Sequence, residues 1–159
     1  MKWLLISFLL FPSSEIKSGK DSDFFLETIE AVDLHQEFND TIPVVFLYFQ
    51  PDGCALCDVY FLRLFEHLED SGLIHQVIAF HPDLPEKIVN HYLSEKQLNS
   101  FQSQINMVSF KVVQNLNSPP KLNPKIFYLL DPKTRHLKII NIEEGVDLKA
   151  ILATLSEGF

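Results

Sequence analysis

Apolar residues change their spacing several times along the chain, and each spacing predicts a different element. Residues 43–49 (PVVFLYF) are continuously apolar and rich in β-branched and aromatic side chains, which is typical of a strand buried on both faces of a sheet. Residues 76–80 (QVIAF) form a second, shorter run of this kind. Between them, from Tyr60 to Leu68, apolar residues recur at helical spacing among charged ones. This part of the chain therefore predicts a strand, a helix and a strand.

The remaining pattern adds helices on either side and a hairpin near the end. Residues 24–38 predict a first helix, residues 85 to about 105 predict a more polar one, and residues 107–113 fit either a strand or a helix end. Two apolar runs around the turn Asp131–Thr134 predict an antiparallel hairpin over residues 125–142. A closing amphipathic helix is marked by Leu148, Ile151, Leu152 and Leu155. Alternating helices and strands indicate the α/β class.

The two cysteines of the chain, Cys54 and Cys57, stand where the first long apolar strand gives way to a helix. The free backbone N–H groups and the positive dipole end of a helix N-terminus stabilise a thiolate, so we expect a lowered pKa for Cys54. Residues three apart on a helix share a face, so the two sulfurs can form a disulfide. Cys57 can then attack a mixed disulfide at Cys54 and release the product. The pair predicts reversible two-electron thiol chemistry.

Composition and charge limit the other possibilities. With 159 residues, 47% of them hydrophobic and 21% charged, the chain is long enough for one domain with its own core. A net charge of −8 argues against nucleic acid or anionic lipid as the main partner. Structural zinc normally needs four ligands, and neither a second cysteine pair nor a close histidine pair completes such a set. We therefore expect a monomer with no metal and no cofactor.

The N-terminus has the pattern of a targeting segment. Residues 1–14 combine the positive Lys2 with an apolar run that is too short to span a bilayer comfortably. They predict a signal peptide or an uncleaved N-terminal anchor, followed by a polar linker over residues 15–23 and a folded domain over residues 24–159. The expected location is outside the cytoplasm, periplasmic or secreted, with membrane attachment only if the segment is retained.

Several of these features together resemble the thioredoxin-like superfamily. The resemblance rests on the apolar strand, the segment 49–57 (FQPDGCALC), the later segment 123–131 (NPKIFYLLD) and the terminal helix. It is closest to exported, periplasmic-type members that enter the cysteine motif through Pro-Asp. It implies a three-layer α/β fold, with a central mixed β-sheet flanked by helices, over roughly residues 24–157.

The resemblance also implies roles for individual residues. Cys54 would be the attacking thiol and Cys57 the resolving one, linked as a redox-active disulfide in the oxidised form. Pro124, which opens the third core strand, would have a cis peptide bond and face the cysteines. It would present the backbone of Asn123 to a bound peptide and keep metal ions off the thiols. The partners would be protein thiols or disulfides and a redox partner protein.

The chain also departs from the thioredoxin pattern. Tyr48 occupies the position where thioredoxins place a buried acid, so the sequence assigns no proton relay, and the Ala55-Leu56 pair does not fix the redox potential. The leading interpretation is a thiol-disulfide oxidoreductase whose direction of electron flow is open. The alternatives are a binding or chaperone module without turnover and a metal-handling protein. A copper-binding form would use a wider cysteine spacing and a distant histidine, for which His136 is a loose candidate.

Overall fold

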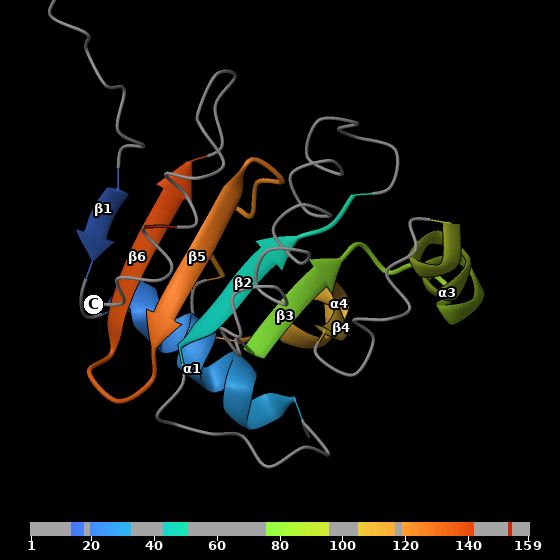
Figure 1. Ribbon diagram of the computed structural model, residues 1–159. Helices are drawn as coiled ribbons and strands as arrows, with labels where there is room; N and C mark the ends of the chain where they lie inside the picture. The colour runs from blue at the N-terminus through green and yellow to red at the C-terminus, as the bar shows by residue number, and fades with distance from the viewer. Residues whose placement is uncertain are drawn as a thin grey trace, which may run out of the picture.

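Six strands form one sheet in the computed structural model, which describes residues 14–17, 20–32, 43–50, 76–95, 105–116, 119–141 and 153 (Figure 1). The strand order is β1-β6-β5-β2-β3-β4. The strands are β1 (Ser14–Lys17), β2 (Val44–Tyr48), β3 (Gln76–His81), β4 (Ile105–Ser109), β5 (Ile126–Asp131) and β6 (His136–Asn141). The helices in the described part are α1 (Lys20–Ala31), α3 (Glu86–Glu95) and α4 (Phe110–Val113).

Strand β2 lies inside the sheet with a neighbour on each side. It runs parallel to β3, with Tyr48 opposite Phe80, and antiparallel to β5, with Leu47 opposite Phe127. Four of its residues, 44–47, are fully buried. A strand with neighbours on both edges and helices on both faces has no solvent side, which explains its continuously apolar sequence. The predicted strands over 43–49 and 76–80 are confirmed.

Helices cover both faces of the sheet. On one face, Phe25 of α1 packs against Phe46 and Tyr128, with ring centroids 4.7 and 4.9 Å apart respectively. Side chains alternate along a strand, so Phe49 points to the other face. There its ring meets Tyr92 of α3 edge to face at 4.3 Å. The predicted three-layer α/β architecture, with a mixed sheet between helices, is confirmed (Figure 1).

The predicted hairpin is formed by β5 and β6, and Asp131 organises its turn. One carboxylate oxygen of Asp131 accepts hydrogen bonds from the backbone N–H groups of Lys133 (2.9 Å) and Thr134 (3.2 Å), and the other accepts from the Thr134 hydroxyl (2.7 Å). Partial burial raises the pKa of Asp131, but these hydrogen bonds outweigh it and hold the pKa below its usual value. Arg135 closes the turn in the left-handed region, with φ 60°.

The structure differs from the sequence prediction at two strands. Residues 15–23 are predicted to be a linker, whereas they contain most of β1, which pairs antiparallel with β6, and the first residues of α1. The helix predicted from residue 85 to about 105 is α3, and its predicted end, Ile105, instead begins β4. A short edge strand is stabilised by pairing with a neighbouring strand. The local sequence pattern does not reveal this pairing. The division into a leader and one domain stays a prediction.

Some of the other predicted elements are confirmed, and some lie outside the described residues. The predicted first helix is confirmed as α1, although it begins at Lys20 rather than Phe24. Residues 107–113, which fit a strand or a helix end, contain both, because β4 runs to Ser109 and α4 begins at Phe110. The predicted helix that starts at the cysteine pair and the closing helix lie outside the described residues. None of the described helices has the length and apolar character needed to cross a bilayer.

Candidate functional site

The parallel strands bring several polar segments to one edge of the sheet. Strands β2, β3 and β4 run in the same direction, so their carboxyl ends lie side by side, and the antiparallel β5 begins at the same edge (Figure 1). We call this the carboxyl edge, and it comprises Gln50, His81–Asp83, Ser109–Lys111 and Asn123–Pro124. In sheets of this type, ligands bind outside the carboxyl ends of parallel strands. The carboxyl edge is therefore the candidate functional site.

The cysteine pair follows directly from this edge in sequence. Cys54 and Cys57 lie outside the described residues, and so does their predicted disulfide. Gln50, the last described residue after β2, precedes Cys54 by four positions. Four residues span at most about 14 Å even when fully extended. The length of the chain therefore keeps Cys54 within that distance of the carboxyl edge.

Asn123 and Pro124 lie at the same edge, but the prediction of a cis bond between them is wrong. The described chain contains no cis peptide bond. Instead, Asn123 and Pro124 begin a β-turn in which the Ile126 N–H donates to the Asn123 carbonyl at 3.0 Å. The Asn123 side chain also accepts a hydrogen bond from the Lys125 N–H at 2.9 Å. Asn at the first and trans proline at the second position suit a type I or II turn, whereas a cis proline requires the third position.

A polar cluster that the sequence analysis did not identify joins the ends of β3 and β4. Asp83 accepts hydrogen bonds from the Ser109 hydroxyl and from the Lys111 ammonium group, each at 3.2 Å. These bonds and the positive charge of Lys111 hold the pKa of Asp83 below its usual value. The three residues are 26 and 28 positions apart in sequence. Only the strand order could reveal them, because Asp83 and Lys111 follow neighbouring strands.

His81 is the buried polar residue of this edge, with 7% of its surface exposed. Its Nδ1–H donates to the carbonyl oxygen of Pro82 at 2.8 Å. A carbonyl oxygen can only accept, so in the neutral ring Nε2 holds the lone pair. On the other face of the sheet, half-buried Tyr48 packs edge to face against Phe110 at 6.4 Å. Tyr48 thus contacts an aromatic ring at the position where thioredoxins place an acid.

His136, the loose candidate for a copper ligand, lies at the opposite end of the sheet. It pairs with Asp131 at the end of β5, next to the start of β2. The five residues of β2 separate that end from the carboxyl edge. At the usual rise per residue this is a distance of about 16 Å. The described strands therefore do not bring His136 to the edge from which the chain leads to the cysteines.

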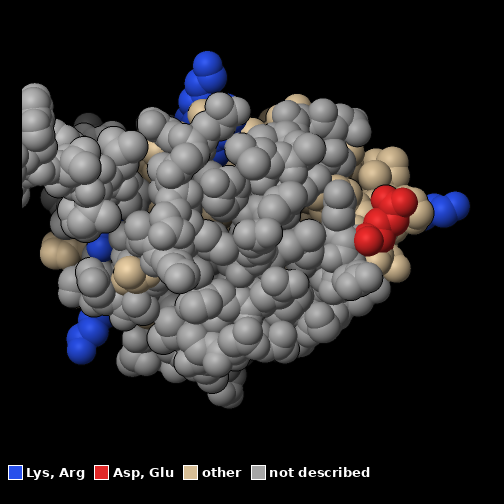
Figure 2. Space-filling view, turned by 45° about the horizontal axis from the view of Figure 1, so that its top comes forward, with Lys and Arg blue, Asp and Glu red and all other residues tan. Residues whose placement is uncertain are grey.

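Two further observations concern ions at the described surface. Among the described residues, no three His, Cys, Asp or Glu side chains are grouped closely enough to hold a metal ion. On the face shown in Figure 2, the described lysine and arginine side chains project at separate places around the rim. In this view, the described residues do not form a broad basic surface of the kind that binds nucleic acid.

Comparisons with known proteins support the fold. The chain matches no model of a protein family, and it matches no curated protein. Among solved structures, a SCO1/SenC family lipoprotein from Bacillus anthracis is 13% identical, covering 74% of this chain and 82% of its own, with a TM-score of 0.57. BsSco, a member of the Sco family of cytochrome c oxidase assembly proteins with a disulfide switch, is 16% identical, covering 74% of this chain and 80% of its own, with a TM-score of 0.50. The predicted thioredoxin-like fold is confirmed.

Proposed function

We propose that this protein exchanges disulfides with protein substrates through Cys54 and Cys57. The thiolate of Cys54 attacks a substrate disulfide, forms a mixed disulfide and releases one substrate thiolate. The thiolate of Cys57 then attacks the sulfur of Cys54, which forms the Cys54–Cys57 disulfide and releases the second substrate thiolate. Two electrons pass from the protein to the substrate, and the same steps in reverse oxidise a dithiol. A redox partner protein restores the starting state.

One observation carries this proposal: the cysteine pair directly follows the inner strand of a thioredoxin-like sheet. Strand β2 ends at Tyr48, and the motif begins six residues later. A cysteine pair that closes so short a loop adds little stability, because it removes little chain entropy from the unfolded state. Chemistry is therefore the better reason for its presence. The disulfide switch described for BsSco is consistent with such a role.

Cys54 should be the more reactive thiol in the reduced protein. We expect alkylation below neutral pH to modify Cys54 before Cys57, since the helix N-terminus predicted at the motif stabilises its thiolate. Brief labelling with iodoacetamide at pH 6, followed by peptide mapping, measures the ratio of the two adducts. The unfolded protein in urea, in which the two thiols should react alike, is the control. Preferential labelling of Cys57 in the folded protein would reverse the assigned roles.

Asn123 and Pro124 are proposed to bind the substrate backbone beside the cysteines. Their support is their place at the carboxyl edge, where β5 begins next to the end of β2. Pro124→Ala should lower the free energy of unfolding by only about 0.4–1 kcal/mol, because it frees a backbone angle in the unfolded chain. It should nevertheless slow disulfide exchange.

Pro132→Ala is the matched control for this experiment. Pro132 follows Asp131 in the hairpin turn at the other end of the sheet, so its replacement removes the same ring far from the carboxyl edge. Urea unfolding should show similar losses of stability for both variants, while only Pro124→Ala slows reduction of a disulfide-containing peptide. Equal exchange rates for the two variants would remove Pro124 from the substrate site.

The two alternatives make different predictions. A binding or chaperone module would use the carboxyl edge without turnover, so it would bind partners and fail to reduce insulin disulfides. A metal-handling protein would retain metal at the cysteines after purification. The structural neighbour BsSco belongs to a family of assembly proteins, which is consistent with the binding or chaperone alternative. An insulin reduction assay together with metal analysis of the purified protein separates the three functions.

We also propose that the protein acts outside the cytoplasm. The apolar segment after Lys2 supports export, and the lipoprotein from Bacillus anthracis is a structural neighbour. The position of β1 limits any cleavage of the leader. Cleavage has to occur before Ser14 if the Ser14–Lys17 strand is to pair with β6. N-terminal sequencing of the mature protein tests this limit.

A further inference from the structure

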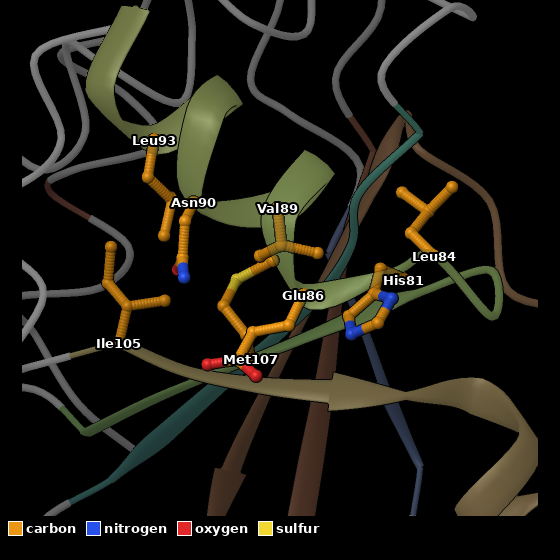
Figure 3. A pocket seen from close by; sticks show the side chains of 8 residues that line it. All are labelled: His81, Leu84, Glu86, Val89, Asn90, Leu93, Ile105 and Met107. Atoms are coloured by element: carbon orange, nitrogen blue, oxygen red, sulfur yellow. The ribbon is translucent and has the colours of Figure 1, made fainter.

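A cavity of about 380 Å³ lies between α3 and the outer part of the sheet. Figure 3 shows that α3 covers it from one side and β4 lies along the other. Its lining residues are His81, Leu84, Glu86, Val89, Asn90, Leu93, Ile105 and Met107. The volume falls within the usual range of about 300–1,000 Å³ for small-molecule sites. The proposed thiol exchange leaves this cavity without a role.

Apolar side chains form one part of the cavity wall, and polar side chains form the rest. Val89 and Leu93, one helical turn apart on α3, are each only 4% exposed, and Ile105 of β4 faces them with 7% exposed. Leu84 and Met107 extend the apolar lining (Figure 3). Such walls favour an aliphatic body, because burying apolar surface contributes roughly 25 cal/mol per Å². The cavity therefore suits a ligand with a short hydrocarbon chain.

The polar groups of the cavity mainly accept hydrogen bonds. Nδ1–H of His81 is used by Pro82, so the neutral ring offers the lone pair of Nε2. Glu86, when ionised, has only acceptor atoms, and Asn90 has both donors and an acceptor. No Lys or Arg is found among the described residues that line the cavity. In Figure 3 the imidazole of His81 lies at one end, on the same side as Glu86 and Met107. A ligand should therefore bring donors and positive charge.

We propose that this cavity binds an alkylammonium group, with the hydrocarbon chain between α3 and β4 and the ammonium group at Glu86 and His81. An ammonium ion has three N–H donors and no acceptor, which matches a carboxylate and an imidazole lone pair. A carboxylate or phosphate ligand would face Glu86 without a compensating lysine or arginine. The net charge of −8 also attracts cations to the protein. The proposal does not depend on turnover at the cysteines.

Three ligands of equal chain length test the proposal on the full chain. Hexylamine, hexanol and hexanoate share the same hydrocarbon body and differ only in the charge of the head group. Titration calorimetry at pH 7.5 should rank hexylamine first, hexanol second and hexanoate last. Glu86 is exposed, so solvent screens its ion pair with the ammonium group, and the expected preference for hexylamine over hexanol is up to about fivefold. Hexanoate that binds as tightly as hexylamine would overturn the proposal.

Matched variants on α3 locate the site. Glu86→Gln should remove the preference for hexylamine over hexanol, whereas Glu95→Gln, a neutralised carboxylate on the same helix outside the cavity, should keep it. Asn90→Phe should fill the cavity and abolish binding of both ligands. Lys87→Phe adds the same ring to an exposed position that does not line the cavity and should leave binding intact. Equal effects of Glu86→Gln and Glu95→Gln would exclude the proposed site.

The ammonium group could belong to a free amine or to a lysine side chain of a protein. A capped peptide with one lysine, and the same peptide with norleucine, distinguish these sources by competition with hexylamine. Displacement by the lysine peptide alone assigns the site to a lysine side chain. No displacement by either peptide, with hexylamine still bound, assigns it to free amines. Displacement by both peptides alike would show that charge is not recognised and would overturn the proposal.

Discussion

Replacing Cys57 with serine is expected to abolish turnover and to leave the protein covalently joined to its partners through Cys54. Without the resolving thiol, the mixed disulfide at Cys54 has no internal nucleophile to release it. Cells that produce Cys57→Ser should therefore contain high-molecular-mass adducts that disappear on reduction. Non-reducing gel electrophoresis with mass spectrometry of the adducts measures their amount and names the partners.

Two control variants make this result specific. Cys54→Ser lacks the attacking thiol and should form no adducts, and the double variant should behave in the same way. If Cys57→Ser traps no partner while the unmodified protein still cycles between its oxidised and reduced forms, the exchange mechanism is wrong. If Cys54→Ser traps partners and Cys57→Ser does not, the two cysteines have the opposite roles, and equal trapping by both variants would mean that neither role is assigned to one cysteine.

Phe46→Ala is expected to lower the free energy of unfolding by about 3–5 kcal/mol. Phe46 is fully buried in β2 between Phe25 of α1 and Phe80 of β3, with ring centroids 4.7 and 6.0 Å away respectively. Alanine removes most of a ring from a site where helix and sheet pack together, and the rigid strand cannot close the resulting cavity. Urea unfolding followed by circular dichroism measures the change.

The exposed apolar residue Val112 provides a control for this substitution. It is 61% exposed on α4, so Val112→Ala should change the free energy of unfolding by less than about 0.5 kcal/mol. A loss below about 1 kcal/mol for Phe46→Ala would contradict the packing of α1 on the sheet.

The sequence predicted those parts of the fold that local pattern determines. The run 43–49 is apolar throughout because β2 is buried on both faces, and the hairpin was recognisable from its turn, where Asp131 binds the backbone of the next residues. Strand β1 could not be predicted in this way, and β4 was indicated only as one of two possibilities for residues 107–113. Both lie at the outer edges of the described sheet and depend on pairing with β6 and β3, which are distant in sequence.

The candidate site was predictable only where its residues are adjacent in sequence. The spacing of Cys54 and Cys57 is visible directly, whereas the contact of Asp83 with Lys111 depends on the order of β3 and β4. The resemblance to thioredoxin-like proteins predicted the position of Pro124 correctly but not the conformation of its peptide bond. Its position before the third core strand was predicted, but its peptide bond is trans, because Asn123 and the proline form the first two positions of a turn.

A redox titration of the cysteine pair tests the central claim most directly. The full chain is equilibrated with glutathione buffers of defined potential, and free thiols are alkylated and counted by mass spectrometry. Disulfide exchange through this pair predicts a single transition in which Cys54 and Cys57 lose their thiols together. The transition should have a two-electron slope, which means that the ratio of oxidised to reduced protein changes tenfold for every change of about 30 mV in the potential. Two thiols that remain reduced at every potential, or that only form separate glutathione adducts, would contradict it.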